Sequence, residues 1–438
     1  MSQINSHLLV QKTSNLSGLV TPPSSKSHSI RALILALLAK GESVLTNSLD
    51  CSDMSDAMRI CGQLGANISV EDGTVCINSA GLPLQATVPI VNSGNSGIST
   101  HFIMPLLGLR RECEKPIILD CGEQMRARPI VPLVTALRAL GLCIDYLAKE
   151  GQLPISVCGQ LSGGVTEVDG ITSQYLSALL VSLPCAPMDS EITVTDLHER
   201  PYVDMTLDWL KKQGIRYRHT AIDNRDIYHI PGRQSYNAFN ATIAGDFSSA
   251  SYLIIAAVLC TGRVELNGLD MQDPQGDKRL VTLLQEMGAA IEISAQGLII
   301  EGSRPLKGIK IDADDIPDLL PALAVIGTYA SGKTELTNVR QARIKETDRI
   351  RSMSEGLRRM GAKVEVHEDG MTLYPSVLQG ATVKGYNDHR TVMALAVAGL
   401  KAEGQTEIDD AHAVNKTFPN FVSLMQSLGA NMEVKNVN

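Results

Sequence analysis

The feature that most restricts the fold of this chain is a segment that recurs six times along it. Each copy has the spacing of an amphipathic helix, then a glycine, then the alternating pattern of a strand with one buried face. The glycines lie 68 to 76 residues apart, at Gly65, Gly141, Gly214, Gly288, Gly361 and Gly429. Glycine suits the left-handed position just past a helix end, and this regular spacing indicates one structural unit copied six times.

A second series of helical segments precedes the first in every copy. These segments, such as IRALILALLA and TVMALAVAGL, are apolar nearly all round after a polar first turn, which is typical of buried helices whose N-termini alone reach water. Five of the copies also continue into a short second strand. We therefore predict an α/β fold of six βαβαββ repeats, with buried helices behind sheets and three repeats in each of two lobes. The crossover between the lobes is expected near residues 244–246.

Composition limits the classes of partner. A net charge of -8 and a pI near 5.6 argue against nucleic acid or a membrane surface, since both need a basic face. No apolar run approaches the length of a membrane span, and the start of the chain lacks the pattern of a secretory signal. The nine cysteines are odd in number and include no C-x-x-C, which favours reduced thiols over disulfides or zinc. We expect a cytoplasmic protein without metal or cofactor, whose basic clusters bind small anions.

The strongest local signal is the charged stretch from Arg343 to Arg349, which alternates in sign and contains Lys345 and Glu346. It lies between a strand-like segment and an amphipathic helix pattern. Cations at a helix N-terminus are unfavourable unless an anion binds there. The stretch therefore predicts an anion site that holds a carboxylate for proton transfer, and the alternative is a solvated charged face.

Residues 327–334 match the P-loop pattern G-x-x-x-x-G-K-[ST]. A P-loop follows a strand and opens a helix, whereas here a buried helix pattern precedes the match and a strand pattern follows it. The other repeats have a glycine at the same turn. We therefore interpret Gly332 as a helix-to-strand turn and predict no nucleotide site.

Polar motifs stand at the starts of most buried helices, and each one alone could be a helix cap or a turn. They read SSKSHSIR (24–31), GNSG (94–97), RARP (126–129), TSQ (172–174), PD (317–318), KETDR (345–349), NDHR (387–390) and NKTFP (415–419). In this order the set closely resembles the motifs of the 5-enolpyruvylshikimate-3-phosphate synthase family, the 3-phosphoshikimate 1-carboxyvinyltransferases. The resemblance covers essentially the whole chain.

The resemblance implies a fold and a reaction. Residues 24–243 would form one lobe, and residues 1–23 with 244–438 the other, with two crossings and a cleft that closes on substrate. The reaction moves the enolpyruvyl group of phosphoenolpyruvate to the 5-hydroxyl of 3-phosphoshikimate and releases phosphate, in the shikimate pathway to chorismate and the aromatic amino acids. It needs no metal, because cations and helix N-termini stabilise the developing charge. A monomer is expected.

The resemblance also implies the site residues. Asp318 would accept a proton, Glu346 would donate one, and Lys26 would be the third catalytic residue. Phosphoenolpyruvate would contact Lys26, Gly97, Arg128, Gln174, Arg349, Arg390 and Lys416. The 3-phosphoshikimate would contact Lys26, Ser27, Arg31, Thr172, Ser173, Gln174, Asp318, Gln341 and Lys345.

The chain departs from the family pattern at a few of these places. Glu199 stands where a serine would touch the shikimate phosphate, and Gln341 replaces a common asparagine. Ile98 and His101 replace a threonine and an arginine beside Gly97. Glyphosate binds this family in the phosphoenolpyruvate subsite, and we expect the change at Ile98 to make the enzyme more tolerant of it.

Two alternative functions stay open from the sequence. One is the sister enolpyruvyl transferase that acts on a UDP-amino sugar through a reactive loop cysteine, for which Cys113 and Cys121 lie in the right region but without the arginine-rich signature. The other is a catalytically idle, anion-binding member of the fold. It would have lost the acid and base, yet Asp318 and Glu346 are both present.

Overall fold

A computed structural model describes residues 6–436 of the chain. Within these residues the strands form six sheets of four strands each. The strand orders are β14-β3-β5-β4, β6-β7-β9-β8, β10-β11-β13-β12, β2-β15-β17-β16, β18-β19-β21-β20 and β22-β23-β1-β24. In every sheet the first two strands are parallel and the other pairs are antiparallel, so one βαβαββ unit is repeated six times. This confirms the predicted fold class.

The chain forms two compact units. We call residues 26–243 the central unit, and the described residues up to Ser25 together with those from Ala244 onward the terminal unit. The chain therefore passes between the units at 25–26 and 243–244, whereas the family resemblance implied 23–24 and 243–244. Each unit has its own hydrophobic core.

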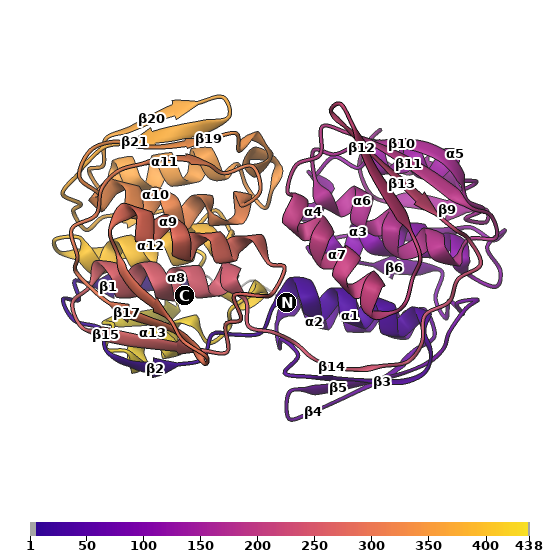
Figure 1. Cartoon of the computed structure of the whole chain (residues 1–438), viewed down its shortest axis with the longest axis horizontal. Coiled ribbons are helices and arrows are strands. Elements are labelled where there is room, and N and C mark those ends of the chain that lie inside the picture. The colour runs from indigo at the N-terminus through magenta and orange to yellow at the C-terminus, as the bar shows by residue number, and fades with distance from the viewer. Residues whose placement is uncertain (1–5, 437–438) are drawn as a thin grey trace. The chain divides into compact units, whose positions relative to one another are not determined.

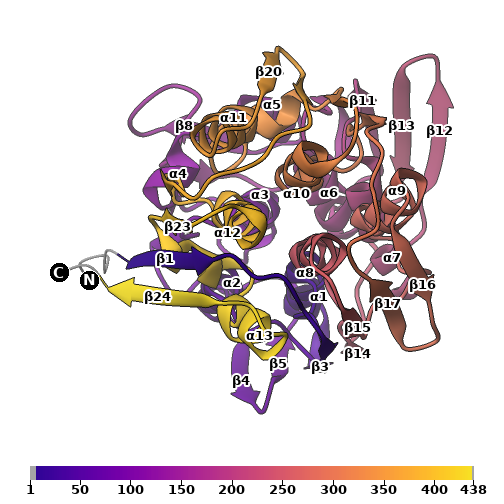
Figure 2. The ribbon, with the colours of Figure 1, turned by 90° about the vertical axis from the view of Figure 1, so that its left-hand side faces the viewer.

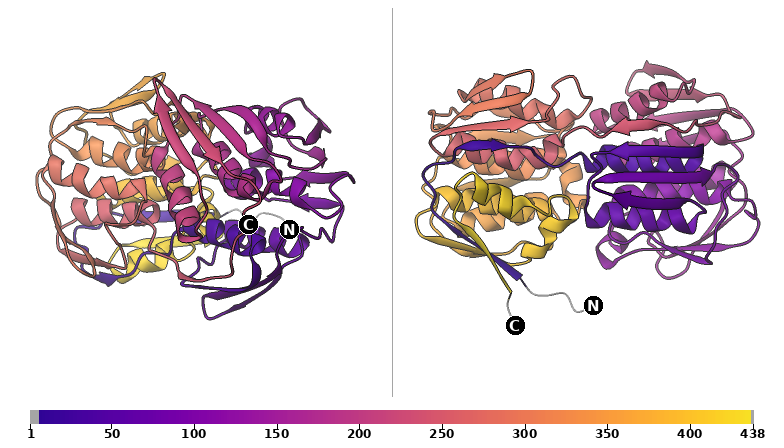
Figure 3. Two further views of the ribbon diagram at one scale, coloured as in Figure 1. Left: turned by 45° about the vertical axis from the view of Figure 1, so that its right-hand side comes forward. Right: turned by 90° about the horizontal axis from the view of Figure 1, so that it is seen from below.

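The central unit contains repeats one to three. Its buried helices are α1 (Lys26–Leu38), α3 (Gly97–Leu106) and α6 (Ser173–Ser182), and its other helices are α2 (Ser52–Gln63), α4 (Glu123–Arg126), α5 (Val131–Ala139) and α7 (Arg200–Lys212). Its strands are β3 (Lys40–Thr46), β4 (Asn67–Glu71), β5 (Thr74–Ala80), β6 (Ile90–Asn92), β7 (Ile117–Asp120), β8 (Cys143–Tyr146), β9 (Ile155–Cys158), β10 (Gly164–Asp169), β11 (Ser190–Thr195), β12 (Arg218–Ile222), β13 (Arg225–Ile230) and β14 (Asn240–Thr242). Helix α3 packs against both α1 and α6, and the indigo sheet of the first repeat lies over the helices of its unit (Figure 3).

The terminal unit contains repeats four to six. Its buried helices α8 (Phe247–Leu259), α10 (Leu320–Tyr329) and α12 (His389–Lys401) lie side by side (Figure 1). Its outer helices are α9 (Arg279–Met287), α11 (Arg349–Arg359) and α13 (Phe421–Ser427). Its strands are β1 (Ser6–Gln11), β2 (Gly18–Val20), β15 (Arg263–Asn267), β16 (Ala290–Ile293), β17 (Gly297–Glu301), β18 (Lys310–Asp312), β19 (Thr334–Thr337), β20 (Val364–His367), β21 (Gly370–Leu373), β22 (Thr382–Val383), β23 (Gln405–Ile408) and β24 (Met432–Asn436).

Three strands complete repeats that are distant in the sequence. Strand β1 lies between β23 and β24 and supplies the strand that the sixth repeat lacks in the sequence (Figure 2). Strand β2 pairs in parallel with β15 of the fourth repeat. Strand β14 returns from the end of the central unit to pair with β3 of the first repeat. In each unit, therefore, some sheets are completed by a strand that lies far from the rest of its repeat in the sequence.

The glycines that end the outer helices behave as predicted. All six have a positive φ, between 71° and 105°, which a side chain would strain. Gly332, in the segment that matches the P-loop pattern, lies in a helix-to-strand turn as predicted, because α10 comes before it and β19 follows it. Lys333 is exposed and pairs with Glu335 on the same strand edge. Among the described residues, no helix is long and apolar enough to cross a membrane.

Candidate functional site

Arg349 is the centre of the charged cluster in the terminal unit. It is the first residue of α11, and its side chain is only 1% exposed. Its guanidinium donates from Nη1 to Asp318 Oδ1 at 2.7 Å, from Nη2 to Glu346 Oε2 at 2.6 Å and from Nε to Asp388 Oδ2 at 2.8 Å. The stretch that contains Arg349 is therefore part of a buried ion-pair network, and the alternative of a solvated charged face is wrong for this residue.

Two further cations complete the cluster. Arg390 Nη2 donates to Asp318 Oδ2 at 2.7 Å, and Lys416 Nζ lies 3.6 Å from Glu346 Oε1. Each of the two carboxylates is thus shared between Arg349 and a second cation. This brings together five of the residues that the sequence singled out.

Electrostatics fixes the ionisation state of Asp318. Burial alone would raise the pKa of this carboxyl, but Arg390, Arg349 and Lys345 together hold it well below its usual range. For Arg349, burial alone would lower the pKa of the guanidinium. Its carboxylate neighbours outweigh burial and raise that pKa. Asp318 is therefore a carboxylate whose proton affinity depends on how fully those cations are neutralised.

Helix N-termini place these groups. Asp318 lies in a short 3₁₀ turn just before α10, Arg349 opens α11, and Arg390 lies in the first turn of α12. These three helices pack against one another, so their N-terminal residues meet. The partial positive charge of each N-terminus adds to that of the side chains and favours a bound anion.

Sequence reasoning missed Asp388 as a site residue. It is completely buried, caps α12 by accepting from Arg390 N at 2.9 Å, and also holds Arg349 Nε. Its position just before a buried helix, inside the NDHR motif, was the available signal. Its second role could not be read from the sequence, because Arg349 lies 39 residues away.

Asp277 is a second carboxyl that the sequence did not indicate. It is 2% exposed and accepts a hydrogen bond from the Ser248 hydroxyl. Burial, together with the nearby charge of Asp318, raises the pKa of Asp277 to about 7. A carboxyl whose neutral form is favoured by burial therefore lies beside the cluster.

Gln341, which the sequence assigned to substrate, is fully buried in the structure. Its side-chain amide donates to the backbone oxygen of Asp314 at 2.8 Å and so holds the loop that leads to Asp318. Its contact with substrate stays a prediction.

In the central unit, the start of α1 carries Lys26 and Arg31. Lys26 Nζ pairs with Asp53 Oδ2 at 3.0 Å. Arg31 is buried and donates from Nε to Thr206 Oγ1 at 2.8 Å and from Nη2 to the backbone oxygen of Tyr202 at 2.9 Å. Burial lowers the pKa of Arg31 to about 10. Arg31 thus ties α1 to α7, and its predicted contact with substrate stays untested.

The starts of α3 and α6 meet at Gly97. A Cβ on Gly97 would lie 2.4 Å from Arg128 Nη1 and 3.3 Å from Gln174 Oε1, so a side chain at this position would displace the Arg128 guanidinium. His101 Nδ1 hydrogen-bonds to Gln174 Oε1 at 2.6 Å, and its ring meets Tyr175 edge-on with centroids 5.1 Å apart. The structure therefore brings together Gly97, Arg128 and Gln174, and shows that His101 orients Gln174.

Thr172 and Ser173, at the N-terminus of α6, both contact Glu199. Thr172 caps the helix by accepting from Gln174 N at 3.4 Å. Its hydroxyl and that of Ser173 also donate to the Glu199 carboxylate. The residues named by the sequence therefore fall into two clusters, one in each unit.

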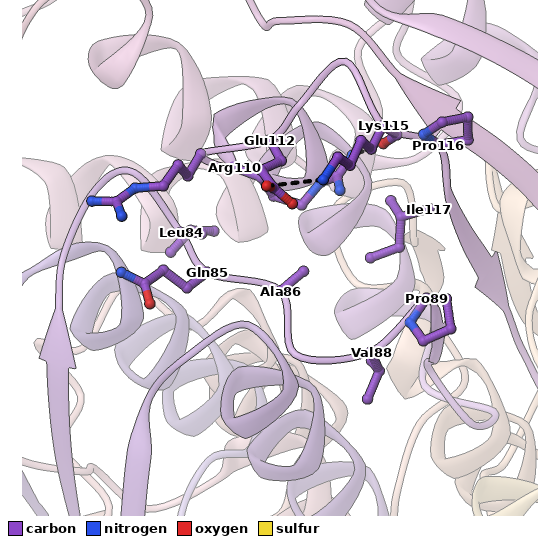
Figure 4. Close-up of a pocket in the computed structure, with 11 residues that line it drawn as sticks. Leu84, Gln85, Ala86, Val88, Pro89, Arg110, Glu112, Lys115, Pro116 and Ile117 are labelled. Atoms are coloured by element: carbon purple, nitrogen blue, oxygen red, sulfur yellow. Dashed lines mark hydrogen bonds and ion pairs between the residues drawn. The ribbon is translucent and has the colours of Figure 1, made fainter.

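A separate surface pocket of about 380 Å³ lies in the central unit, between the loop before β6 and the turn before β7 (Figure 4). Pro89, Arg110 and Ile117 are among its lining residues, and Lys115 pairs with Glu112 at its rim at 3.0 Å. None of the residues singled out by the sequence lines it. This pocket is therefore distinct from both clusters.

The chain matches the sequence profile of the EPSP synthase (3-phosphoshikimate 1-carboxyvinyltransferase) family over residues 10–425. The chain belongs to this family. It is similar to the 3-phosphoshikimate 1-carboxyvinyltransferase of Acetivibrio thermocellus, at 44% identity over 97% of this chain and 99% of the relative. It is also similar to that of Methanocaldococcus jannaschii, at 41% identity over 98% and 99% of the two chains.

Among solved structures, an EPSP synthase from Acinetobacter baumannii resembles this EPSP synthase family member with a TM-score of 0.82 and 25% identity, over 98% of this chain and 100% of the other. Of the two cysteines that the alternative function could use, Cys113 and Cys121, the second fits poorly. Burial raises the pKa of the Cys121 thiol to about 11, which disfavours a reactive thiolate.

Proposed function

We propose that Asp318 and Glu346 perform the proton transfers of an enolpyruvyl transfer from phosphoenolpyruvate to the 5-hydroxyl of 3-phosphoshikimate, with release of phosphate. This is the reaction of the family, and it belongs to the shikimate pathway of aromatic biosynthesis. The observation that carries the assignment is that both carboxylates contact one buried guanidinium, Arg349, and that each also faces a second cation.

In the proposed reaction Asp318 accepts the proton of the 5-hydroxyl as that oxygen attacks C2 of phosphoenolpyruvate. Glu346 delivers a proton to the methylene carbon, which becomes a methyl group. In the tetrahedral intermediate Glu346 then takes back a proton from the methyl group, and phosphate leaves with the proton that Asp318 had accepted, which restores the double bond and both carboxyl groups. Both groups act as general acid–base catalysts, so each must change protonation during turnover.

Substrate binding prepares the two carboxylates for these steps. Arg390 and Arg349 keep the pKa of Asp318 low before the substrates bind. When the carboxylate and phosphate of phosphoenolpyruvate neutralise those arginines, the pKa of Asp318 rises and it becomes a stronger base. The same anions would compete with Glu346 for its contacts with Lys416 and Arg349.

We further propose the binding roles. Lys26, Gly97, Arg128, Gln174, Arg349, Arg390 and Lys416 bind phosphoenolpyruvate. Lys26, Ser27, Arg31, Thr172, Ser173, Gln174, Asp318, Gln341 and Lys345 bind 3-phosphoshikimate, and Lys26 is the third catalytic residue. Burial gives Arg31 and Gln341 a positioning role in addition, since both hold neighbouring backbone.

The test is the kinetics of Asp318→Asn and Glu346→Gln, which keep the shape of each side chain and remove its charge. We expect each variant to lower kcat by about 100-fold or more while the KM of either substrate changes by only a few-fold. Glu355→Gln, at an exposed carboxylate on the same helix α11, is the control and should retain kcat. A kcat within threefold of the natural enzyme would refute the roles of Asp318 and Glu346.

The same phosphate-release assay separates the alternative functions. Activity with 3-phosphoshikimate and none with a UDP-amino sugar is expected. The reverse result would favour the sister enolpyruvyl transferase, and no activity with either acceptor would favour an idle member.

We also propose that the enzyme works in the cytoplasm as a monomer and that glyphosate inhibits it by competing with phosphoenolpyruvate. All nine cysteines are free thiols in the structure, which suits a reducing compartment. Sedimentation of the purified protein tests the oligomeric state.

A further inference from the structure

Glu199 is an unusual residue to find at the start of a helix. It stands just before α7 with a left-handed backbone, φ 58°, and is 1% exposed. A buried carboxylate is costly unless it is well hydrogen-bonded. Glu199 must therefore have strong contacts that hold it in place.

Those contacts lie at the N-terminus of α6. One carboxylate oxygen of Glu199, Oε2, accepts from Ser173 N at 3.1 Å, from Ser173 Oγ at 2.8 Å and from Thr172 Oγ1 at 3.3 Å. A backbone N–H and two hydroxyls that converge on one anionic oxygen form the arrangement that also binds phosphate at helix N-termini. Glu199 is thus an anion that is already bound in an anion site.

The residue that follows Glu199 forms an ion pair. Arg200, the first residue of α7, donates from Nη1 and Nη2 to the two oxygens of Asp226, at 3.0 and 2.7 Å. Asp226 also binds His219 Nε2 at 2.7 Å. Rotation about the side-chain bonds of Glu199 would be enough to move its carboxylate away from the α6 N-terminus.

Thr172 and Ser173, which donate these hydrogen bonds to Glu199, are also proposed above to bind 3-phosphoshikimate. Thr172 and Ser173 cannot donate the same hydrogen bonds to Glu199 and to a phosphate oxygen at the same time. A phosphate placed beside the Glu199 carboxylate would also be repelled by its negative charge. Substrate phosphate and the Glu199 carboxylate therefore exclude each other from this position.

We propose that Glu199 is a specificity-determining residue that occupies the phosphate subsite of 3-phosphoshikimate in the free enzyme and is displaced when that phosphate binds. The proposal rests on the proposed function, because it assumes that Thr172 and Ser173 bind this substrate. The observed affinity is reduced by the fraction of enzyme in which Glu199 holds the subsite. The phosphate group thus adds less to substrate affinity than its three donors would allow.

The test compares the binding of 3-phosphoshikimate and of shikimate, which lacks the phosphate, by calorimetry. Glu199→Ser should tighten 3-phosphoshikimate by about tenfold or more and change shikimate by less than threefold. Glu199→Gln removes only the charge, preserves the shape if the serine variant does not fold, and should tighten 3-phosphoshikimate by a smaller factor. Asp196→Asn, an exposed carboxylate in the same connection, is the matched control and should change neither ligand.

Three results would overturn the proposal: unchanged affinity for 3-phosphoshikimate in both Glu199 variants, weaker affinity, or equal tightening of both ligands. Ser173→Ala in the Glu199→Ser background separates the proposal from its premise. If this second change does not weaken 3-phosphoshikimate, Ser173 is not a substrate ligand and the site assignment fails. If it does weaken the substrate while Glu199→Ser alone has no effect, the site assignment stands and only the competition is refuted.

Discussion

Asp277 is a carboxyl group in surroundings that disfavour its charge. Burial and the nearby Asp318 raise its pKa to about 7, whereas an aspartate in an unfolded chain titrates near pH 4. Between these values the folded protein binds more protons than the unfolded chain. The stability contributed by neutral Asp277 is therefore fully present below about pH 4 and is lost as the pH rises through 7.

Asp277→Asn should remove this pH dependence. Near pH 4 we expect the free energy of unfolding of the variant to be no higher than that of the natural protein. Between pH 4 and pH 8 it should rise relative to the natural protein by at most about 4 kcal/mol. Urea unfolding of both proteins at several pH values measures the difference. A difference that does not change with pH would show that Asp277 is already ionised in the folded protein.

We predict that Ile98 affects inhibition by glyphosate. It follows Gly97 at the start of α3 and is 6% exposed, so a change in its size acts on a packed turn. The inhibitor is longer than phosphoenolpyruvate, and a small shift of Gly97 toward Arg128 should penalise it more than the substrate. Ile98→Thr should then lower the glyphosate inhibition constant relative to the phosphoenolpyruvate KM by about tenfold, equivalent to 1 to 2 kcal/mol of packing strain.

Steady-state kinetics with both ligands measures this ratio. Ile98→Val, which keeps a branched apolar side chain, is the control and should leave the ratio near that of the natural enzyme. An unchanged ratio in Ile98→Thr would mean that this position does not set tolerance.

Motifs indicated candidate cations for the site, but they did not indicate which residues those cations contact. Lys26, Arg128 and Arg390 stand in short patterns that resemble a known family. The pairing of Lys26 with Asp53, by contrast, depends on how α2 packs against α1. Such contacts join residues far apart in the sequence, and a single sequence contains no signal for them.

At the scale of elements, Asp388 links the starts of two helices. It caps α12 and pairs with the first residue of α11, so one carboxylate fixes both N-termini that face the site. Removing its charge leaves Arg349 with one fewer partner in a buried position. Such a loss is expensive, about 3 to 5 kcal/mol when a buried pair is broken.

Asp388→Asn should therefore lower both stability and kcat/KM, the latter by about 100-fold, because Arg349 loses its orientation. Asp348 provides the comparison, since it caps α11 but pairs with the half-exposed Arg343 at 2.7 Å. Asp348→Asn should cost less than about 1 kcal/mol. Thermal unfolding and kinetics of the two variants decide the matter, and equal effects would contradict the special role of Asp388.

Periodicity was enough to predict most elements but not how the sheets are completed. The alternation of apolar residues and the six helix-ending glycines gave the βαβαββ unit directly. The pairing of β14 with β3 was not visible, because a three-residue strand has too little pattern to indicate its neighbour. The membership of the first residues in the second lobe came from the family resemblance alone.

At the scale of the whole molecule, one unit is continuous in the sequence and the other is not. The central unit is a single stretch, whereas the terminal unit needs β1 and β2 from the start of the chain and the ten strands β15 to β24 from its second half before its sheets are complete. During synthesis the central unit can therefore fold first, and the first two strands must wait for their partners.

Because β1 pairs with β24, the two ends of the described chain lie next to each other. Ser6 and Asn436 face each other across β1 and β24. A short linker between the original termini, with new ends opened between Ile243 and Ala244, would give a circular permutant in which each unit is continuous and the chain crosses between them once. We expect it to fold and to retain activity within about tenfold, since no paired strand is cut. A control permutant opened inside β19 should not fold, because a paired strand is cut. If the permutant opened between Ile243 and Ala244 also failed to fold, the enzyme would need both of the connections that join its two units.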